Sequence, residues 1–177
     1  MTNDIITAVA NVAIALTFVV GLVFGIAQVR SAARDRRERL TLETLRNFQT
    51  REFATLLQHV VSHTMPSTRD ELLALPADEQ IMFIQFGQQM ESLGMLVAEE
   101  LIDIGLVDKT LGSFVTNAWK KYQAAYLDMR EKLPDPFLAE YFQWLAERIA
   151  ERVRDNPRKP FHEAQASTGQ RVTGGVH

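Results

Sequence analysis

The chain has 177 residues and no cysteine, which excludes a disulfide scaffold and any metal site built from thiolates. It also lacks a glycine-rich phosphate loop, a G-x-S-x-G nucleophile elbow and the set of motifs that marks protein kinases. No segment alternates polar and apolar residues with a period of two over a useful length. We therefore predict an all-α protein without a recognisable motif for phosphate binding or acyl transfer.

A large excess of charge is also missing. The 19 Lys and Arg residues against 22 Asp and Glu residues give a formal net charge of −3 and a pI near 5.8. This mild acidity argues against nucleic acid as a partner. The one dense basic segment follows a long apolar run, where anionic lipid headgroups would attract it by about 1 kcal/mol per charge.

The longest feature that is present is an uncharged run from Ile5 to Val29. A helix of about 25 residues is roughly 37 Å long, which exceeds the thickness of a bilayer hydrocarbon core, about 30 Å. The run contains about ten Val, Ile, Leu or Phe residues between Val12 and Ile26, and they favour insertion by about 3 to 6 kcal/mol. We predict that residues 1–29 form a transmembrane anchor.

A cluster of arginines follows the run and sets its expected orientation: Arg30, Arg34, Arg36, Arg37 and Arg39. Basic residues beside a spanning helix stay on the cytoplasmic side. We therefore expect a single-pass protein of the bacterial inner (plasma) membrane, with the N-terminus out and the C-terminal domain cytoplasmic. A cleaved signal peptide is the alternative, but it carries basic residues before its apolar run, and residues 1–4 contain none. Residues 30–39 would then be a basic juxtamembrane segment in contact with anionic headgroups.

Residues 40–155 carry apolar residues at spacings of three and four, which predicts a bundle of four to five helices. We expect the anchor helix to continue to about His63, with a bend near Thr50. The capping-box spacing of Thr68 and Glu71 predicts a short helix that ends before Pro76. Residues 156–177 are predicted to form a mobile polar tail. The apolar stripe of the first segment is Leu42, Leu45, Phe53, Leu56, Leu57, Val60 and Val61.

Three longer helices are predicted to follow. Pro76 begins the first, which ends at residues 103–105, and Asp135 with Pro136 provides the cap and first-turn proline of the last. Their predicted core positions are Phe83, Phe86, Met90, Leu93, Val97 and Leu101, then Val107, Leu111, Phe114, Ala118, Tyr122, Ala125 and Met129, and finally Leu138, Phe142, Leu145, Ile149 and Val153.

Two histidines, His59 and His63, are four residues apart on one predicted helix and could both face a metal ion. Helical zinc motifs of this kind carry a catalytic Glu between the histidines and a third ligand downstream, whereas here Val60, Val61 and Ser62 lie between them and no acid is positioned to help. We interpret them as residues at the polar edge of an amphipathic helix, with no metal and no cofactor expected.

Four acids, Glu91, Glu99, Glu100 and Asp103, cluster on one predicted helix. Paired carboxylates can perform acid–base chemistry or hold divalent ions. A di-iron bundle, however, takes a Glu-x-x-His pair from each of two helices, and this chain has none. We interpret the cluster as a solvated face.

Aromatic residues are concentrated in the last two predicted helices. Core packing accounts for most of them, and an alternative is that some form a docking face, since Trp and Tyr are favoured anchors at interfaces. The residues of this possible docking face are Trp119, Tyr126, Tyr141 and Trp144.

The most specific pattern lies inside the predicted anchor, where Ala13, Thr17, Gly21 and Gly25 recur every four residues. Small residues on one stripe allow two membrane helices to approach closely, and Gly21 and Gly25 form a G-x-x-x-G motif. Three alternatives stay open: the stripe contacts a second copy of the chain, it contacts a different membrane helix, or it has no role in association.

The layout resembles a bacterial and phage family known as domain of unknown function 4760. The resemblance covers about residues 5–154 and is carried by the apolar N-terminal helix, the arginine-rich stretch and three short motifs. These motifs are TREF at residues 50–53, MESLGMLVAEELIDIGLVD at residues 90–108 and YFQWLAERI at residues 141–149. The resemblance implies a small single-pass helical protein and supplies no activity and no site residues.

We hypothesise a membrane-anchored, self-associating helical module that binds or regulates a protein partner and has no catalytic activity. One alternative is an accessory subunit of a larger membrane complex, which would leave a large apolar patch exposed. A metal-dependent enzyme is the other, and it would need a pocket with convergent titratable groups.

Overall fold

The computed structural model describes residues 2–157 and residue 160; before Leu16, side chains are described only at Asn11 and Ile14. The described residues form six α-helices and no strand, which confirms the predicted all-α class. The predicted tail, residues 156–177, lies almost entirely outside the described residues.

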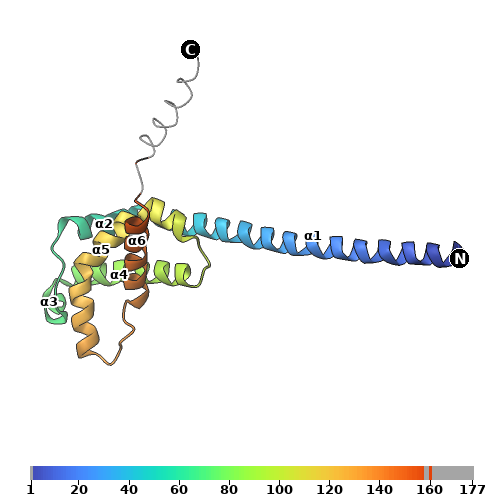
Figure 1. The fold of residues 1–177 in the computed structure, drawn as a ribbon. Helices are drawn as coiled ribbons and strands as arrows, with labels where there is room; N and C mark the ends of the chain where they lie inside the picture. Colours follow the sequence, from blue (N-terminus) through green and yellow to red (C-terminus); the bar gives the residue numbers. More distant parts are fainter. Residues whose placement is uncertain (1, 158–159, 161–177) are drawn as a thin grey trace, which may run out of the picture.

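The first helix, α1 (Thr2–Asn47), is one continuous helix of 46 residues. Figure 1 shows it projecting far from the other helices, with the N-terminus at its free end. The predicted anchor, the basic segment and the start of the bundle are therefore parts of one helix. No Gly or Pro interrupts residues 26–47, so nothing in the sequence ends the helix there.

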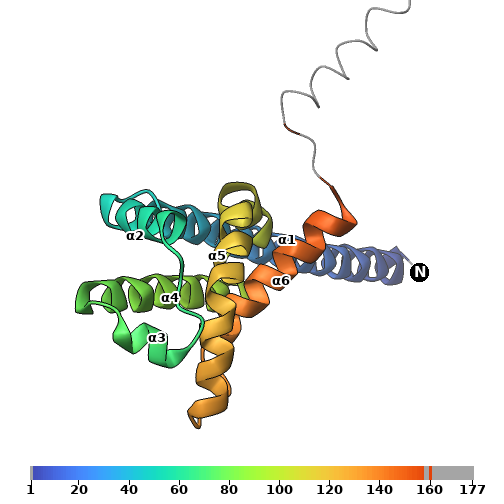
Figure 2. The same ribbon diagram turned by 90° about the vertical axis from the view of Figure 1, so that its left-hand side faces the viewer.

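Five helices form the bundle: α2 (Arg51–Ser62), α3 (Arg69–Ala74), α4 (Ala77–Ala98), α5 (Ile104–Lys132) and α6 (Glu140–Asp155). The most extensive packing is of α6 against α4 and α5, while α2 covers α4 and α3 lies on α5 (Figures 1 and 2). The C-terminal end of α1 reaches the start of α5. The predicted bend near Thr50 is a break, because Thr50 caps α2 by accepting the N–H of Phe53 at 3.2 Å.

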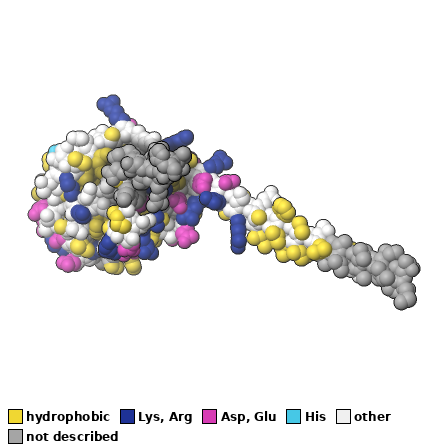
Figure 3. Space-filling view, turned by 45° about the horizontal axis from the view of Figure 1, so that its top comes forward, with side chains coloured by type: hydrophobic (Ala, Val, Ile, Leu, Met, Phe, Trp, Pro, Cys, Tyr) yellow, Lys and Arg dark blue, Asp and Glu magenta, His cyan; other side chains and the backbone are white. Residues whose placement is uncertain are grey.

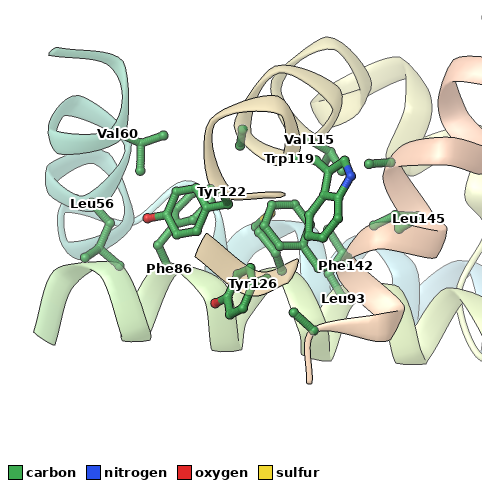
Figure 4. Packing of buried hydrophobic residues seen from close by; sticks show 14 of the residues in the cluster. Leu56, Val60, Phe86, Leu93, Val115, Trp119, Tyr122, Tyr126, Phe142 and Leu145 are labelled. Atoms are coloured by element: carbon green, nitrogen blue, oxygen red, sulfur yellow. The ribbon is translucent and has the colours of Figure 1, made fainter. Parts of the chain in front are cut away.

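The core is aromatic where α4, α5 and α6 meet. Phe83 stacks on Tyr122 with ring centroids 4.3 Å apart, and the ring of Phe86 lies 5.2 Å from Tyr122 and 6.1 Å from Phe142. Figure 4 shows Phe86, Tyr122 and Phe142 converging from the three helices. Each of these rings is at most 1% exposed, so nearly all of its apolar surface is removed from water: Phe83, Phe86, Tyr122 and Phe142.

Two glycines of α4 let the neighbouring helices approach closely. A Cβ at Gly87 would collide with the hydroxyl of Tyr126, and a Cβ at Gly94 would collide with the backbone carbonyl of Tyr141. Gly87 and Gly94 are seven residues apart and therefore lie on one face of α4. This face is the one that packs against α5 and α6.

The predicted helix boundaries are wrong in two places. Helix α4 ends at Ala98, after which Glu100 has a positive φ of 56°, and the helical spacing beyond Val97 no longer holds. As a result Leu101 is 46% exposed and Ile102 takes the buried position at 1%. Helix α6 begins at Glu140, well after the predicted cap at residues 135–136.

Several predicted core positions are also exposed. Leu42, Val61 and Val153 are 57%, 62% and 43% exposed, because each lies at the margin of its helix's apolar stripe. Leu45, Phe53, Leu56 and Val60 are buried as predicted.

Candidate functional site

The apolar half of α1 makes no packing contact with the bundle. Every residue from Leu16 to Val29 is exposed, including Phe18 at 73% and Phe24 at 71%. The segment Leu16–Asn47 is long and apolar enough to cross a membrane, judged by length and composition, and its apolar stretch of 18 residues contains no buried residue. In Figure 3 its side chains form an apolar surface that ends where Lys and Arg side chains begin.

The predicted small-residue stripe lies on this exposed half. Beside Gly21 the helix has a shallow depression lined by Thr17 together with Ile14, Phe18 and Leu22. A Cβ at Gly21 or at Gly25 would meet nothing within 4 Å. The fold itself therefore does not require glycine at either position, although glycine costs about 1 kcal/mol relative to Ala in a helix. The side chain of Ala13 lies outside the described residues.

The arginine cluster divides between solvent and the bundle. Arg30, Arg34, Arg36 and Arg39 are exposed, and Arg34 pairs with Glu38 at 3.3 Å. Arg37 is half-buried; its Nη2 donates to the carbonyl of Ile102 at 3.4 Å, and its Nε is buried without a described partner. The side chain of Arg37 is thus directed at the turn between α4 and α5, while membrane-surface contact of the five arginines stays a prediction.

The junction of α1 with the bundle centres on Thr41, which is fully buried. Its Oγ1 donates to the carbonyl of Arg37 at 2.8 Å and accepts the backbone N–H of Asp103 at 2.9 Å. The carboxylate of Asp103 in turn caps α5 by accepting the N–H of Leu106 at 2.9 Å. One threonine thus connects α1 to the start of α5.

The histidine pair is stacked. The ring centroids of His59 and His63 are 4.5 Å apart with an interplanar angle of 25°, and Nδ1 of His63 lies 3.1 Å from the carbonyl of His59. Stacked rings direct their nitrogen lone pairs side by side, whereas metal ligands must converge on one point. Burial lowers the pKa of His59, and the adjacent His63 adds to the effect while Glu79 opposes it. His59 is only 8% exposed, so its predicted place at the polar edge is wrong.

The acidic cluster is dispersed. The two oxygens of Glu91 accept the backbone N–H groups of Tyr141 at 3.2 Å and Phe142 at 2.8 Å, so this carboxylate caps α6 from the neighbouring helix. Helix α6 has no cap of its own, because the N-cap residue is Ala139 in the left-handed region. Asp103 caps α5, and only Glu99 and Glu100 match the predicted solvated face.

Two other charged side chains, Lys121 and Arg130, donate to backbone carbonyls outside their own helix. Lys121 donates to the carbonyls of Val60, Val61 and His63 at the end of α2, at 2.6, 3.1 and 3.2 Å. Arg130 donates to the carbonyl of Leu138 at 2.7 Å. These contacts join residues that are eight to 61 positions apart, and the sequence carries no signal for them. The charge of Lys121 stabilises carbonyls at the end of α2 that the helical hydrogen-bond pattern leaves unsatisfied.

Two of the four residues of the proposed aromatic docking face lie in the hydrophobic core. Trp119 and Tyr126 are each 6% exposed and belong to the hydrophobic core, which corrects the docking hypothesis for both; Figure 4 shows Trp119 packed with Phe142 and Leu145. Burial raises the pKa of both Tyr122 and Tyr126. Tyr141 and Trp144 are half-buried, so a docking role remains a prediction for these two residues alone.

A groove of about 740 Å³ lies between α4 and the segment formed by the end of α1 and α2. Its floor is apolar, with Phe48, Leu56 and Leu93, and Glu52 is the one charged residue in its lining. Within the described part of the chain, no group of three or more His, Asp or Glu side chains could hold a metal ion. The groove presents amides and hydroxyls, and it brings no set of titratable groups together.

Residues 13–149 match the model of a protein family described as Domain of unknown function (DUF4760). No curated protein and no solved structure matches the chain.

Proposed function

Because the chain belongs to the DUF4760 family, whose description assigns no activity, we propose a function from its geometry: a membrane-anchored helical module that acts by protein–protein contact. The observation that carries this proposal is the complete exposure of residues 16–29. An apolar surface of this size is unfavourable in water and is stable in hydrocarbon.

The arginines support an orientation for the anchor. Arg30, Arg34, Arg36 and Arg39 follow the apolar stretch directly and are exposed, and basic residues beside a spanning helix favour the cytoplasmic side. The proposal therefore places the bundle in the cytoplasm, with these side chains against anionic headgroups of the inner membrane.

Self-association through α1 is the second part of the proposal. The open surface at Gly21 and Gly25 supports it, because a second helix could approach there and gain van der Waals contact that lipid tails do not match. Pairing would bring two bundles to a high local concentration and strengthen weak contacts with a client protein. The carboxylates of Glu91 and Asp103 are already occupied in capping α6 and α5, which favours a binding role over catalysis.

The test measures self-association of the full-length chain in a membrane two-hybrid assay. Gly21→Ile combined with Gly25→Ile fills the depression and preserves hydrophobicity, so the signal should fall strongly. Val20→Ile is the matched control that adds bulk off the stripe and should leave the signal unchanged. Equal signals from all three chains would contradict self-association through the glycines.

In that case an accessory subunit of a larger membrane complex becomes the better account of the stripe. Its partner would be a different membrane helix at the same open surface. Copurification of the wild-type chain with a stoichiometric membrane protein, lost in the double-isoleucine variant, identifies this alternative.

A further inference from the structure

Helix α4 exposes a face without charge. From Gln80 to Ala98 the only charged residue is Glu91, and its carboxylate is occupied by the N-terminus of α6. The exposed residues of this face are Ile81, Ile84, Gln85, Gln88, Ser92 and Met95. Among them Ile81 is 51% and Ile84 48% exposed.

The exposed faces of the other long bundle helices are different. Helix α5 exposes Lys109, Lys120 and Lys121, and α6 exposes Arg148 and Arg152 among other charges. A solvated helix face ordinarily carries such charges. The uncharged face of α4 is therefore a local property that the general composition of the surface does not explain.

The spacing of this face is that of a coiled-coil seam. Five of its residues follow one another at steps of four, three, four and three positions. The mean step of 3.5 residues keeps such a stripe facing a parallel partner helix along its whole length. We name this set the α4 seam: Ile81, Gln85, Gln88, Ser92 and Met95. The core-facing positions of α4 lie on other sides of the helix, against α2, α5 and α6.

The direction of α4 constrains its partner. In both ribbon views the axis of α4 has roughly the same orientation as the axis of α1, and α4 lies beside the line of α1 (Figures 1 and 2). Two copies anchored in one membrane share the direction of α1, so their α4 helices would lie parallel. In a parallel two-fold pair each residue faces its own copy. A charged residue in the seam would then repel itself, whereas an amide can donate to and accept from an identical amide.

We propose that the α4 seam is a homotypic contact, in which α4 of a second copy packs in parallel register against it. The amides of Gln85 and Gln88 pair with their own counterparts, and Ile81 and Met95 supply apolar contact at the two ends. The groove beside the seam shares Gln85, Gln88 and Ser92 in its lining, so it offers space for the partner's flanking side chains.

The size of the seam explains why it requires the anchor. Fifteen residues of helix extend about 21 Å, and such a contact buries less than the roughly 800 Å² per partner of a stable interface. The contact is therefore weak in dilute solution and becomes populated at the high effective concentration within a membrane. The proposal rests on the anchoring part of the proposed function and does not depend on the glycine stripe.

The absence of cysteine allows a direct test in membranes that contain the full-length chain. Ile81→Cys, Gln88→Cys and Met95→Cys each introduce the only thiol, and mild oxidation should give disulfide-linked dimers in all three. Asn117→Cys, an exposed amide position on α5, is the matched control and should remain monomeric. Crosslinking of Gln88→Cys alone would indicate an antiparallel pair, and equal crosslinking of Asn117→Cys would indicate random collision; either result overturns the proposal.

A charge exchange tests the self-facing geometry, with Ile81→Cys as the reporter thiol. Gln88→Glu and Gln88→Lys should each reduce dimer formation severalfold when expressed alone, and coexpression of the two should restore it. Failure of the mixture to exceed both single variants overturns the parallel register.

The two proposals fail separately. Seam crosslinking through Gln88→Cys should persist when Gly21→Ile and Gly25→Ile are added, because a disulfide traps the weak contact that remains after the equilibrium association measured by the two-hybrid assay has fallen. Loss of the crosslink overturns the seam as an independent contact. If the glycine variant keeps the wild-type two-hybrid signal and no seam crosslinks form, both the glycine contact and the seam are overturned. If the glycine variant loses the two-hybrid signal and no seam crosslinks form, the seam alone is overturned.

Discussion

The two halves of α1 have similar backbone geometry and opposite surroundings. From Leu16 to Val29 every side chain is exposed, and the bundle contacts none of them. Near the other end Thr41 is fully buried, Leu45 is 8% exposed and Arg37 reaches the turn between α4 and α5. Helix continuity therefore does not imply a common environment. The junction fixes the direction in which the apolar half leaves the bundle.

Arginine substitutions should have the largest effect, on the exposed half. Val20→Arg with Phe24→Arg should remove the chain from the membrane fraction, because each arginine near the bilayer centre costs about 2.5 to 3.5 kcal/mol. Membrane flotation measures the result. Leu42→Arg with Val61→Arg places the same charges at exposed apolar positions of the other half and the bundle, and this chain should still float. Retention of both chains in the membrane would contradict the assigned anchor.

The bundle core should give the next largest effect. Phe142→Ala removes a fully buried ring that contacts three other aromatic rings, and it should lower the free energy of unfolding by about 3 to 5 kcal/mol. Leu101→Ala, at a half-exposed position, should change it by no more than about 0.5 kcal/mol. Urea unfolding of the full-length chain in detergent, followed by circular dichroism, measures both values. A large decrease in the free energy of unfolding for Leu101→Ala would support the longer α4 predicted from the sequence.

The junction is tested by Thr41→Val, which keeps the shape of the side chain and removes its hydroxyl. The N–H of Asp103 then loses its acceptor, so unfolding should become easier by about 1 to 3 kcal/mol. Thr55→Val is the control, because Thr55 bonds only the carbonyl of Arg51 four residues earlier, on an exposed surface. Equal losses in the two variants would mean that the long-range hydrogen bond contributes nothing.

The smallest effect concerns pH and the docking of α3 on α5. The N–H of Arg69, followed by Lys132, holds the pKa of Asp128 below its usual 3.8. A depressed carboxyl pKa contributes stability above the unfolded value, and this contribution is lost as pH falls through the folded value. Asp128→Asn should therefore be slightly less stable than wild type at neutral pH and equal to it in strong acid. If the stability gap between Asp128→Asn and wild type stayed unchanged in acid, the result would contradict the assignment.

Local patterns in the sequence determined the helices and most of the core. Spacings of three and four identified Phe83, Phe86, Tyr122 and Phe142 as buried, because one face of a helix repeats with that period wherever the core lies. The cap at Thr68 was also readable, since its partner Glu71 is three residues away. The uncharged run that forms the exposed half of α1 was visible for the same reason.

Only the tertiary structure decided which charges are structural. Glu91 accepts a hydrogen bond from the start of a helix 50 residues away, and Lys121 donates to the end of a helix 61 residues away. Arg37, a member of the basic cluster, donates to a carbonyl 65 residues away. The same distances explain the errors at Trp119 and Tyr126, whose burial depends on the approach of other helices. A helix end needs a hydrogen-bond partner, but its own sequence does not specify which distant side chain supplies it. The packing of the helices determines which side chain that is. The same packing leaves the α4 seam exposed.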